Sequence, residues 1–220
     1  MTKTLIAVPC FDMVHTDFME SFVKLRKPEG TSFTILKNTM IYDARNIVAM
    51  NAIKAGFDRV FWMDSDMTFP PDALEELSAD MDTGLDFVTG VYYTRRPPQI
   101  KPVIYNELHW EVKEDGRLDT GATNYTNYPG NALFEIAAAG FGCCLTSVDL
   151  LRRVGEKFGS PFTPLEAMGE DMSFCFRAAQ IGAHLFCDSM IQCGHLGQYT
   201  FDNSFDPFDH TGTEGASDNA

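Results

Sequence analysis

Apolar and polar residues follow two different rhythms along the first half of the chain. Four short apolar runs are rich in β-branched and aromatic residues, as is typical of buried strands, and they cover residues 5–8, 33–36, 60–63 and 86–91. Between them, apolar residues recur every three or four positions, which indicates amphipathic helices over residues 17–27, 44–55 and 72–81. Strands alternating with helices at this spacing predict an α/β fold, with a mainly parallel sheet covered on both faces.

The helix periodicity also predicts which side chains face the core. In the first helix, Phe18, Phe22 and Leu25 lie on one face. In the second helix, Ile47, Val48 and Ile53 are expected to point inward, and Gly56 is expected to end the helix.

The pattern changes beyond residue 92. An alternating segment over residues 103–112 and a polar loop over residues 116–131 predict an antiparallel excursion with a mobile loop. The pattern then predicts a single strand over residues 135–145, interrupted by glycines, and a helix over residues 148–158 capped by Ser147. A helix over residues 171–180 and short strands over residues 184–187 and 191–195 complete the predicted elements.

Length and composition place this pattern in a soluble globular protein. The 220 residues fit one domain, expected over residues 1–198, followed by a polar and flexible tail over residues 199–220. No apolar run approaches the roughly 20 residues that cross a bilayer, and the apolar start is too short for a secretory signal. We therefore expect a cytoplasmic protein. The six cysteines are expected to be reduced core residues, because no Cys-x-x-Cys pair occurs and most of them lie in apolar runs. A zinc site at Cys187, Cys193 and His195 would have an unusual spacing.

The net charge of −14 argues against a non-specific duplex-binding protein, which would normally carry a basic face. A local basic cluster remains at Arg95 and Arg96, followed by Lys101.

Asp64-Ser65-Asp66 is the strongest candidate for chemistry, because it follows directly after an apolar strand. Alternation along a strand would turn Asp64 and Asp66 to one side and Ser65 to the other. Two carboxylates at the carboxyl end of a strand can hold a hard divalent cation and a ribose. Taken alone, however, the same three residues could form a solvated acidic turn.

Three further features follow in order: Gly140 and Gly142 within an apolar strand, Glu170-Asp171 at a helix start, and a late histidine, His195. Together with the acidic pair, this order resembles the core of GT-A-fold glycosyltransferases, especially the large inverting family two. The resemblance covers roughly residues 4–197. It implies a Rossmann-like three-layer sandwich with a small antiparallel excursion on the acceptor side. Compact chains of this kind resemble enzymes of bacterial or phage origin.

The resemblance also implies roles for individual residues. Asp66 and His195, with Asp64 directly or through water, would bind Mn²⁺ or Mg²⁺, and Asp171 would be the catalytic base beside Glu170. Arg95 and Arg96 would contact phosphate or the acceptor. The expected donor-binding residues are Pro9, Cys10, Phe11, Arg45, Asp64, Ser65, Gly140 and Gly142.

These roles imply transfer of a sugar from a nucleotide-diphosphate sugar, expected to be a UDP-sugar, to an acceptor hydroxyl with inversion. The sequence does not distinguish among four classes of acceptor: a glycan, a protein, a small metabolite and a modified nucleobase in DNA. The sequence leaves two alternatives. A sugar nucleotidyltransferase would need a glycine-rich basic loop after the first strand, where the chain has Pro9-Cys10-Phe11. A catalytically silent nucleotide-sugar-binding protein would not need Asp66, Asp171 and His195.

Overall fold

A seven-stranded sheet forms the centre of the protein in the computed structural model, which describes residues 1–197. The strand order is β2-β1-β3-β10-β5-β11-β8, and five of the seven strands point the same way, with β10 and β8 reversed. The strands are β1 (Thr4–Cys10), β2 (Thr31–Lys37), β3 (Arg59–Met63), β5 (Phe87–Val91), β8 (Leu133–Ile136), β10 (Cys143–Ser147) and β11 (Leu185–Gln192). The expected tail over residues 199–220 lies outside the described residues.

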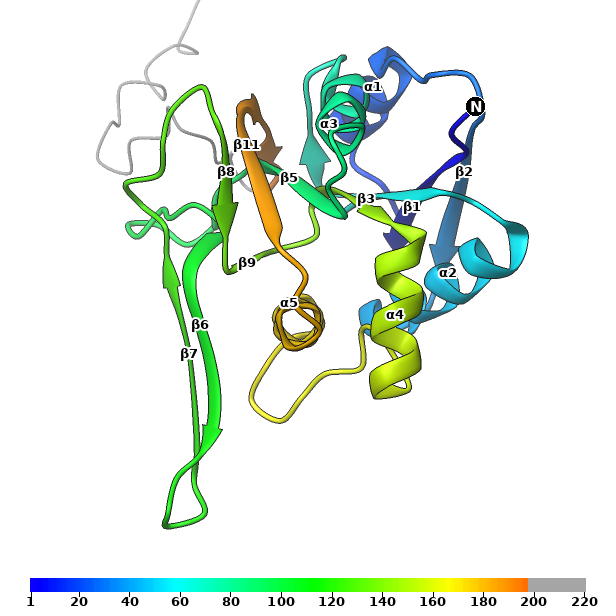
Figure 1. The fold of residues 1–220 in the computed structure, drawn as a ribbon. Helices are drawn as coiled ribbons and strands as arrows, with labels where there is room; N and C mark the ends of the chain where they lie inside the picture. Colours follow the sequence, from blue (N-terminus) through cyan, green and yellow to red (C-terminus); the bar gives the residue numbers. More distant parts are fainter. Residues whose placement is uncertain (198–220) are drawn as a thin grey trace, which may run out of the picture.

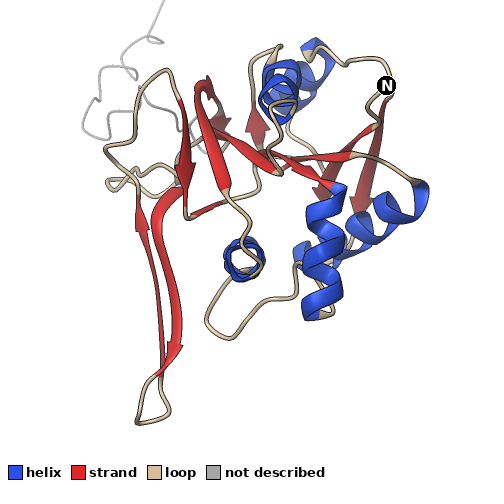
Figure 2. Ribbon diagram, viewed as in Figure 1, coloured by secondary structure: helices blue, strands red, loops and turns tan. Residues whose placement is uncertain are grey.

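Helices cover both faces of this sheet, as Figures 1 and 2 show. Helices α1 (Thr16–Lys24) and α3 (Ala73–Met81) lie on one face, and their apolar side chains share a core with Ile6, Phe61 and Val88. Helices α2 (Ile41–Ala55), α4 (Val148–Phe158) and α5 (Glu170–Gln180) cover the other face and pack on Trp62 and Phe87. The predicted three-layer sandwich is therefore confirmed.

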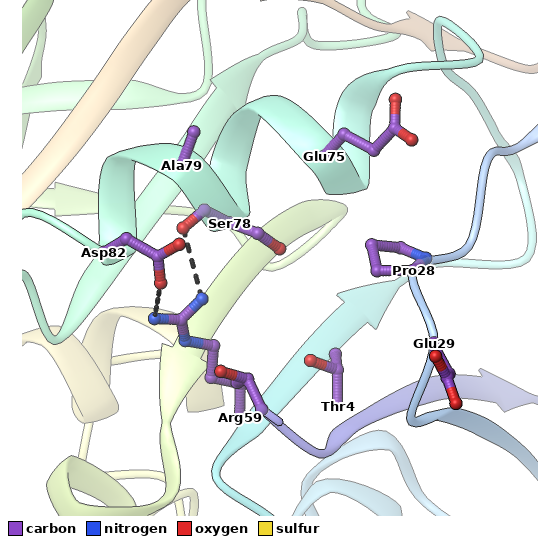
Figure 3. Close-up of a pocket in the computed structure, with 9 residues that line it drawn as sticks. Thr4, Pro28, Glu29, Arg59, Glu75, Ser78, Ala79 and Asp82 are labelled. Carbon is purple, nitrogen blue, oxygen red and sulfur yellow. Dashed lines mark hydrogen bonds and ion pairs between the residues drawn. The ribbon is translucent and has the colours of Figure 1, made fainter.

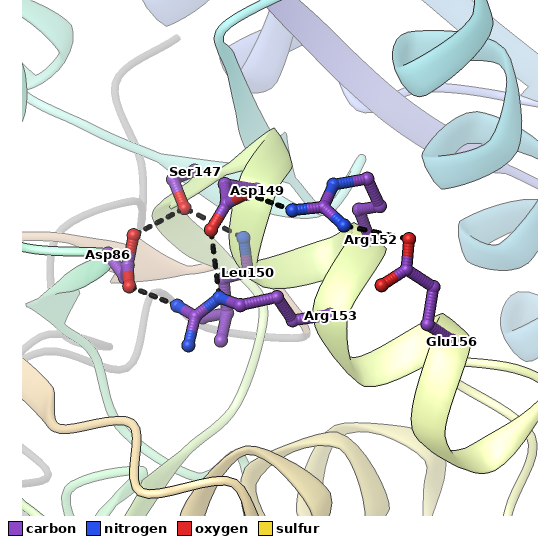
Figure 4. A network of polar contacts seen from close by, with 7 residues as sticks. All are labelled: Asp86, Ser147, Asp149, Leu150, Arg152, Arg153 and Glu156. Atoms are coloured by element: carbon purple, nitrogen blue, oxygen red, sulfur yellow. Dashed lines mark hydrogen bonds and ion pairs between the residues drawn. The ribbon is translucent and has the colours of Figure 1, made fainter.

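Local sequence signals end helix α2 and begin helix α4 at the predicted residues. Gly56 adopts the left-handed conformation, with a φ of 67°, and ends α2. Ser147 caps α4 by accepting a hydrogen bond from the Leu150 backbone N–H at 3.0 Å. Figure 4 shows that the Ser147 hydroxyl also donates to Asp86, which in turn pairs with Arg153 one turn into the helix. The cap thus ties the start of α4 to the residue before β5.

Two small sheets lie outside the main one. Strands β6 (Ile104–Val112) and β7 (Leu118–Asn124) form an antiparallel hairpin that projects from the body, and β9 (Ala138–Ala139) pairs with its base (Figure 1). The hairpin is anchored where the Trp110 indole N–H donates to the Glu166 carbonyl at 3.1 Å. The second small sheet pairs β4 (Met67–Thr68) with β12 (Gly194–His195).

The structure corrects four sequence expectations. The polar loop expected over residues 116–131 contains β7. Its Thr, Gly and Asn residues are typical of a loop, but pairing with β6 satisfies the backbone hydrogen bonds and makes the segment a strand. The single strand expected over residues 135–145 is instead three strands divided between two sheets. The two late strands expected over residues 184–187 and 191–195 are a longer β11 and a separate β12. Ile47 is 37% exposed and does not point inward.

The remaining expectations about burial hold. Phe18 and Leu25 of the α1 face are buried, and all six cysteines are buried and free. Over residues 1–197, none of the helices combines the length and apolarity needed to cross a membrane.

Candidate active site

The acidic pair lies in a turn at the carboxyl end of β3. The Asp64 backbone N–H donates to the Gly142 carbonyl at 3.1 Å, and the Met67 N–H donates back to the Asp64 carbonyl at 3.2 Å. The chain is therefore no longer a strand at residues 64–66. The positions of the two carboxylates are therefore set by this turn and not by the strand alternation expected from the sequence.

The structure brings Asp66 and His195 together through the pairing of β4 with β12. His195 lies opposite Met67 in this pairing, and its Nε2 is 3.7 Å from Asp66 Oδ2. His195 Nδ1 lies 2.7 Å from the Tyr93 carbonyl. A carbonyl can only accept, so Nδ1 carries a proton and Nε2 is the ring nitrogen that faces Asp66. Two residues that are 129 positions apart in the chain thus present an oxygen and a nitrogen to the same space.

Arg95 neutralises Asp66 in this arrangement. Its Nη1 lies 2.8 Å from Asp66 Oδ2 and also donates to the Leu196 carbonyl at 2.5 Å. Burial would raise the pKa of Asp66, but the interaction with His195 and the charge of Arg95 outweigh it and hold that pKa below its ordinary value. The Asp66 carboxyl is therefore ionised at neutral pH.

Arg45 links the acidic pair to the start of α5. The side chain is 2% exposed, and it reaches Asp64 Oδ1 at 2.8 Å and Glu170 Oε1 at 3.4 Å. Its guanidinium carbon lies 5.3 Å from the Phe141 ring centroid, so the aromatic ring stabilises the buried cation. Nη1 of Arg45 has no hydrogen-bond partner within the described part of the chain. The donor contact expected of Arg45 stays a prediction; in the structure Arg45 pairs with two carboxylates.

Asp171 lies in the first turn of α5, next to Glu170. Its Oδ1 accepts a hydrogen bond from the Met172 backbone N–H at 2.7 Å. Burial and the negative charge of Glu170 raise the pKa of Asp171 to about 6. The helix dipole favours the ionised form, as expected from the sequence, but burial dominates here. A carboxylate with a pKa near the working pH is well matched to accept a proton from a hydroxyl.

Gly140 and Gly142 make room for Tyr92. A Cβ atom on Gly140 would lie 2.0 Å from the Tyr92 hydroxyl, and one on Gly142 would lie 2.9 Å from Tyr92 Cζ. The Tyr92 hydroxyl accepts from the Gly142 N–H at 3.3 Å, and the Tyr92 ring meets the His195 ring edge to face at 5.4 Å. The expected approach of a ligand to these glycines stays a prediction; what the structure places against them is Tyr92.

Sequence reasoning missed Tyr92 and Tyr93, although both contact His195. A signal was present, because both residues follow directly after β5, which runs in the same direction as β3. The carboxyl ends of strands that run in the same direction lie at one edge of a sheet.

The other predicted residues have fewer contacts with the acidic turn. Pro9 and Cys10 are buried at the end of β1, and Phe11 is 70% exposed. The chain that follows reaches the acidic turn, since the His15 N–H donates to the Ser65 carbonyl at 3.4 Å. Arg96 is exposed in the loop after β5 and lines a pocket whose walls do not include Asp66.

A different pocket lies at the opposite edge of the sheet. Figure 3 shows it between α3 and the amino ends of β1 and β3, with Arg59 paired to Asp82 at 2.6 Å. Glu29 and Glu75 also line it. None of the predicted site residues lines this acidic pocket, so it is not part of the candidate active site.

Comparison with known proteins gives no match to any protein-family model and no match among curated sequences. Solved structures do share the fold. The protein A197 from STIV superimposes with a TM-score of 0.63 at 18% identity, covering 90% of this chain and 87% of A197. TarS 1–349 from S. aureus superimposes with a TM-score of 0.51 at 14% identity over 91% of this chain, which spans 60% of that chain. Both proteins are glycosyltransferases, and the likeness shows that this chain has a GT-A-like fold.

Proposed function

We propose that the chain is a glycosyltransferase that moves a sugar from a nucleotide-diphosphate sugar to an acceptor hydroxyl, with inversion at the anomeric carbon. One observation carries the proposal. Arg45 bonds both Asp64 and Glu170, so the strand-end carboxylates and the helix-start carboxylates belong to one site. In a GT-A-like fold this site lies at the edge where ligands of α/β sheets bind.

Asp171 is the proposed base. It takes the proton of the acceptor hydroxyl as the oxygen forms its bond to the anomeric carbon, while the bond to the diphosphate breaks and its electron pair leaves with the diphosphate. Attack on the face opposite the leaving group inverts the anomeric centre. Arg95, 2.8 Å from Asp66, has the charge and reach to meet the negative charge that develops on the leaving oxygens.

Asp66 and His195 fit a divalent cation as a pair. Their nearest atoms are 3.7 Å apart, and the carboxylate oxygen and the imidazole nitrogen suit Mn²⁺ or Mg²⁺. Among residues 1–197 no set of three or more His, Cys, Asp or Glu side chains is arranged around a common metal position. The remaining ligands would therefore come from the donor diphosphate and water. A bound cation would supply Lewis-acid stabilisation of the leaving diphosphate.

The proposal is tested with a panel of nucleotide sugars, including UDP-sugars, in the presence of Mn²⁺. Release of nucleoside diphosphate and transfer of sugar to added hydroxyl acceptors are expected, and the product of an α-linked donor should be β-linked by NMR. An α-linked product would overturn inversion. Nucleotide binding without turnover for any donor would identify a silent binding protein. Formation of a nucleotide sugar from a nucleoside triphosphate and a sugar phosphate would identify a nucleotidyltransferase.

A further inference from the structure

A second pocket lies beside the candidate active site, in the loop that joins β5 to β6. It has a volume of about 490 Å³ and contains two cationic side chains, Arg96 and Lys101. We call it the Arg96 pocket, and its walls are Thr94, Arg96, Pro97, Pro98, Gln99, Lys101, Tyr105 and Asn124. A pocket of this volume can hold a sugar-sized group.

The charge of the Arg96 pocket differs from that of the molecule around it. The chain has 31 acidic and 17 basic residues, yet none of the pocket's lining residues is acidic. Within the described part of the chain, Arg96 and Lys101 form no ion pair. The pocket in Figure 3 shows the opposite situation, because its Arg59 is already paired with Asp82. Among residues 1–197, no acidic side chain competes with an anionic ligand for the two cations of the Arg96 pocket.

Hydrogen bonds hold the loop in shape. The Thr94 N–H donates to the Lys101 carbonyl at 2.9 Å, and the Lys101 N–H donates to the Thr94 hydroxyl at 3.1 Å. The Gln99 N–H donates to the Arg96 carbonyl at 2.9 Å. Asn124 of β7 donates from its amide to the Pro102 carbonyl at 2.8 Å, which fixes the hairpin against the loop. The cations thus project from a backbone that is already ordered, so a ligand need not order it.

The pocket is joined to the proposed chemistry on two sides. Arg95, the neighbour of Arg96, pairs with Asp66 at 2.8 Å. Tyr105 lies in the pocket wall, and its pKa is raised by burial and then by the charge of Asp171, while Arg96 opposes the rise. The Tyr105 hydroxyl is therefore within electrostatic reach of both the proposed base and a pocket cation.

We infer that the Arg96 pocket binds a phosphate group carried by the acceptor, so that the acceptor is a small phosphorylated hydroxyl compound such as a sugar phosphate or polyol phosphate. This inference rests on the proposed function, because it concerns the acceptor of that reaction. Arg96 and Lys101 bind the phosphate, and the hydroxyl of the same molecule lies toward Asp171. A long polyanion such as DNA is disfavoured, because the net charge of −14 repels it beyond the pocket.

The test measures equilibrium binding of matched probes to the full chain by NMR titration. Glucose 6-phosphate and glycerol 3-phosphate are compared with glucose and glycerol, which lack the phosphate. We expect the phosphorylated probes to bind roughly tenfold or more tightly than their partners, since two charge-assisted contacts are involved. Equal binding of each probe and its unphosphorylated partner would overturn the inference.

Variants locate the binding. The double variant Arg96→Gln/Lys101→Gln is expected to lose about tenfold or more in affinity for the phosphorylated probes. Arg117→Gln, an exposed arginine next to β7 at the far end of the hairpin, removes a charge elsewhere and should bind like the wild type. The single variants Arg96→Gln and Lys101→Gln give the same comparison if the double variant unfolds. Unchanged affinity in the folded variants would overturn the inference.

Two further measurements separate this inference from the proposed function. UDP affinity in the presence of Mn²⁺ is expected to be equal in the wild type and the double variant. If the wild type did not bind UDP, the proposed function would be contradicted, whereas the comparison of phosphorylated and unphosphorylated probes would still test the Arg96 pocket. A 12-nucleotide single-stranded DNA is expected to bind no more tightly than glucose 6-phosphate. Tighter binding of the DNA that depends on Arg96 and Lys101 would replace the small acceptor with a nucleic acid.

Discussion

Arg45 controls how charge is distributed among the residues of the site. A buried cation needs paired anions, and Arg45 has two of them, one after β3 and one at the start of α5. Asp171 is left outside these ion pairs, although Arg45 contributes to its electrostatics. Asp64 and Glu170 are thus ion-paired with Arg45, whereas Asp171 has no ion pair with it and a pKa of about 6.

Replacement of Asp171 by Asn should separate binding from chemistry. Asp171→Asn is expected to keep UDP affinity in the presence of Mn²⁺ and to lower the transfer rate by about 10²–10⁴-fold, because a general base acts on the chemical step. Collapse of UDP affinity with turnover of bound donor preserved would instead make Asp171 a donor-binding residue.

The raised pKa of Asp171 adds a pH dependence to the same experiment. The base is active when ionised, so kcat/KM of the wild type should fall about tenfold per pH unit below the pKa of about 6. The fall should be absent from the residual activity of Asp171→Asn. A wild-type profile that stays flat from pH 7 to pH 4.5 would contradict the assignment.

Metal binding is tested at Asp66 and His195. Asp66→Ala and His195→Ala are each expected to weaken Mn²⁺-dependent UDP binding by about tenfold or more, because each removes one of two protein ligands. Arg95→Gln should have the opposite effect on binding of Mn²⁺ alone, since it frees Asp66 from its ion pair. Isothermal titration calorimetry measures both, with the exposed Glu114→Ala as the control. Full metal-dependent binding by both ligand variants would refute the site.

At the scale of the elements, packing between β5, β9 and β10 holds the site together. Tyr92 follows β5 and fills the space that Gly140 and Gly142 leave between β9 and β10. Its ring then supports His195 from β12. Glycines between two strands thus influence the position of a histidine that is far away in the sequence.

Gly140→Ala should therefore destabilise the protein by about 1–3 kcal/mol, because the new methyl group would overlap the Tyr92 hydroxyl. Tyr92→Phe removes that hydroxyl, so the double variant should lose less stability than the two single changes added together. Urea unfolding of the four proteins measures the coupling. Gly130→Ala, where a Cβ would meet nothing within 4 Å, is the matched control. Simple additivity would show that the backbone shifts instead.

The cap of α4 is a second element-scale feature. Ser147→Ala removes the acceptor for the Leu150 N–H and the partner of Asp86, so a loss of about 1–2 kcal/mol is expected (Figure 4). Ser147→Thr keeps a hydroxyl at this position and should recover most of the loss in thermal unfolding. An equal loss in both variants would show that the site is sensitive to shape and not to the cap.

At the scale of the whole molecule, the topology collects the candidate site at one edge of the sheet. The strands β3 and β5 run in the same direction, so Asp64 and Tyr92 follow them at the same edge. The chain then returns through β12, which pairs with β4 directly after the acidic turn. The opposite edge holds the acidic pocket of Figure 3 instead. The fold therefore separates a basic edge pocket near the proposed chemistry from an acidic one away from it.

The sequence was sufficient to predict the layers and the main elements of the first half. Helical periodicity, strand-like apolar runs and the signals at Gly56 and Ser147 act over a few residues, so they can be read without knowing the fold. The acidic pair, the helix-start carboxylates and His195 could likewise be singled out by type and order.

Contacts between distant segments could not be predicted in this way. Strand β7 has a loop-like composition and forms because β6 pairs with it, and the segment over residues 135–145 divides because two different sheets compete for it. The burial of Arg45, the raised pKa of Asp171 and the Tyr92 ring between two glycines all depend on neighbours from other elements. Desolvation, ion pairing and steric fit are properties of the assembled surroundings of a residue, and they have no counterpart in local sequence order.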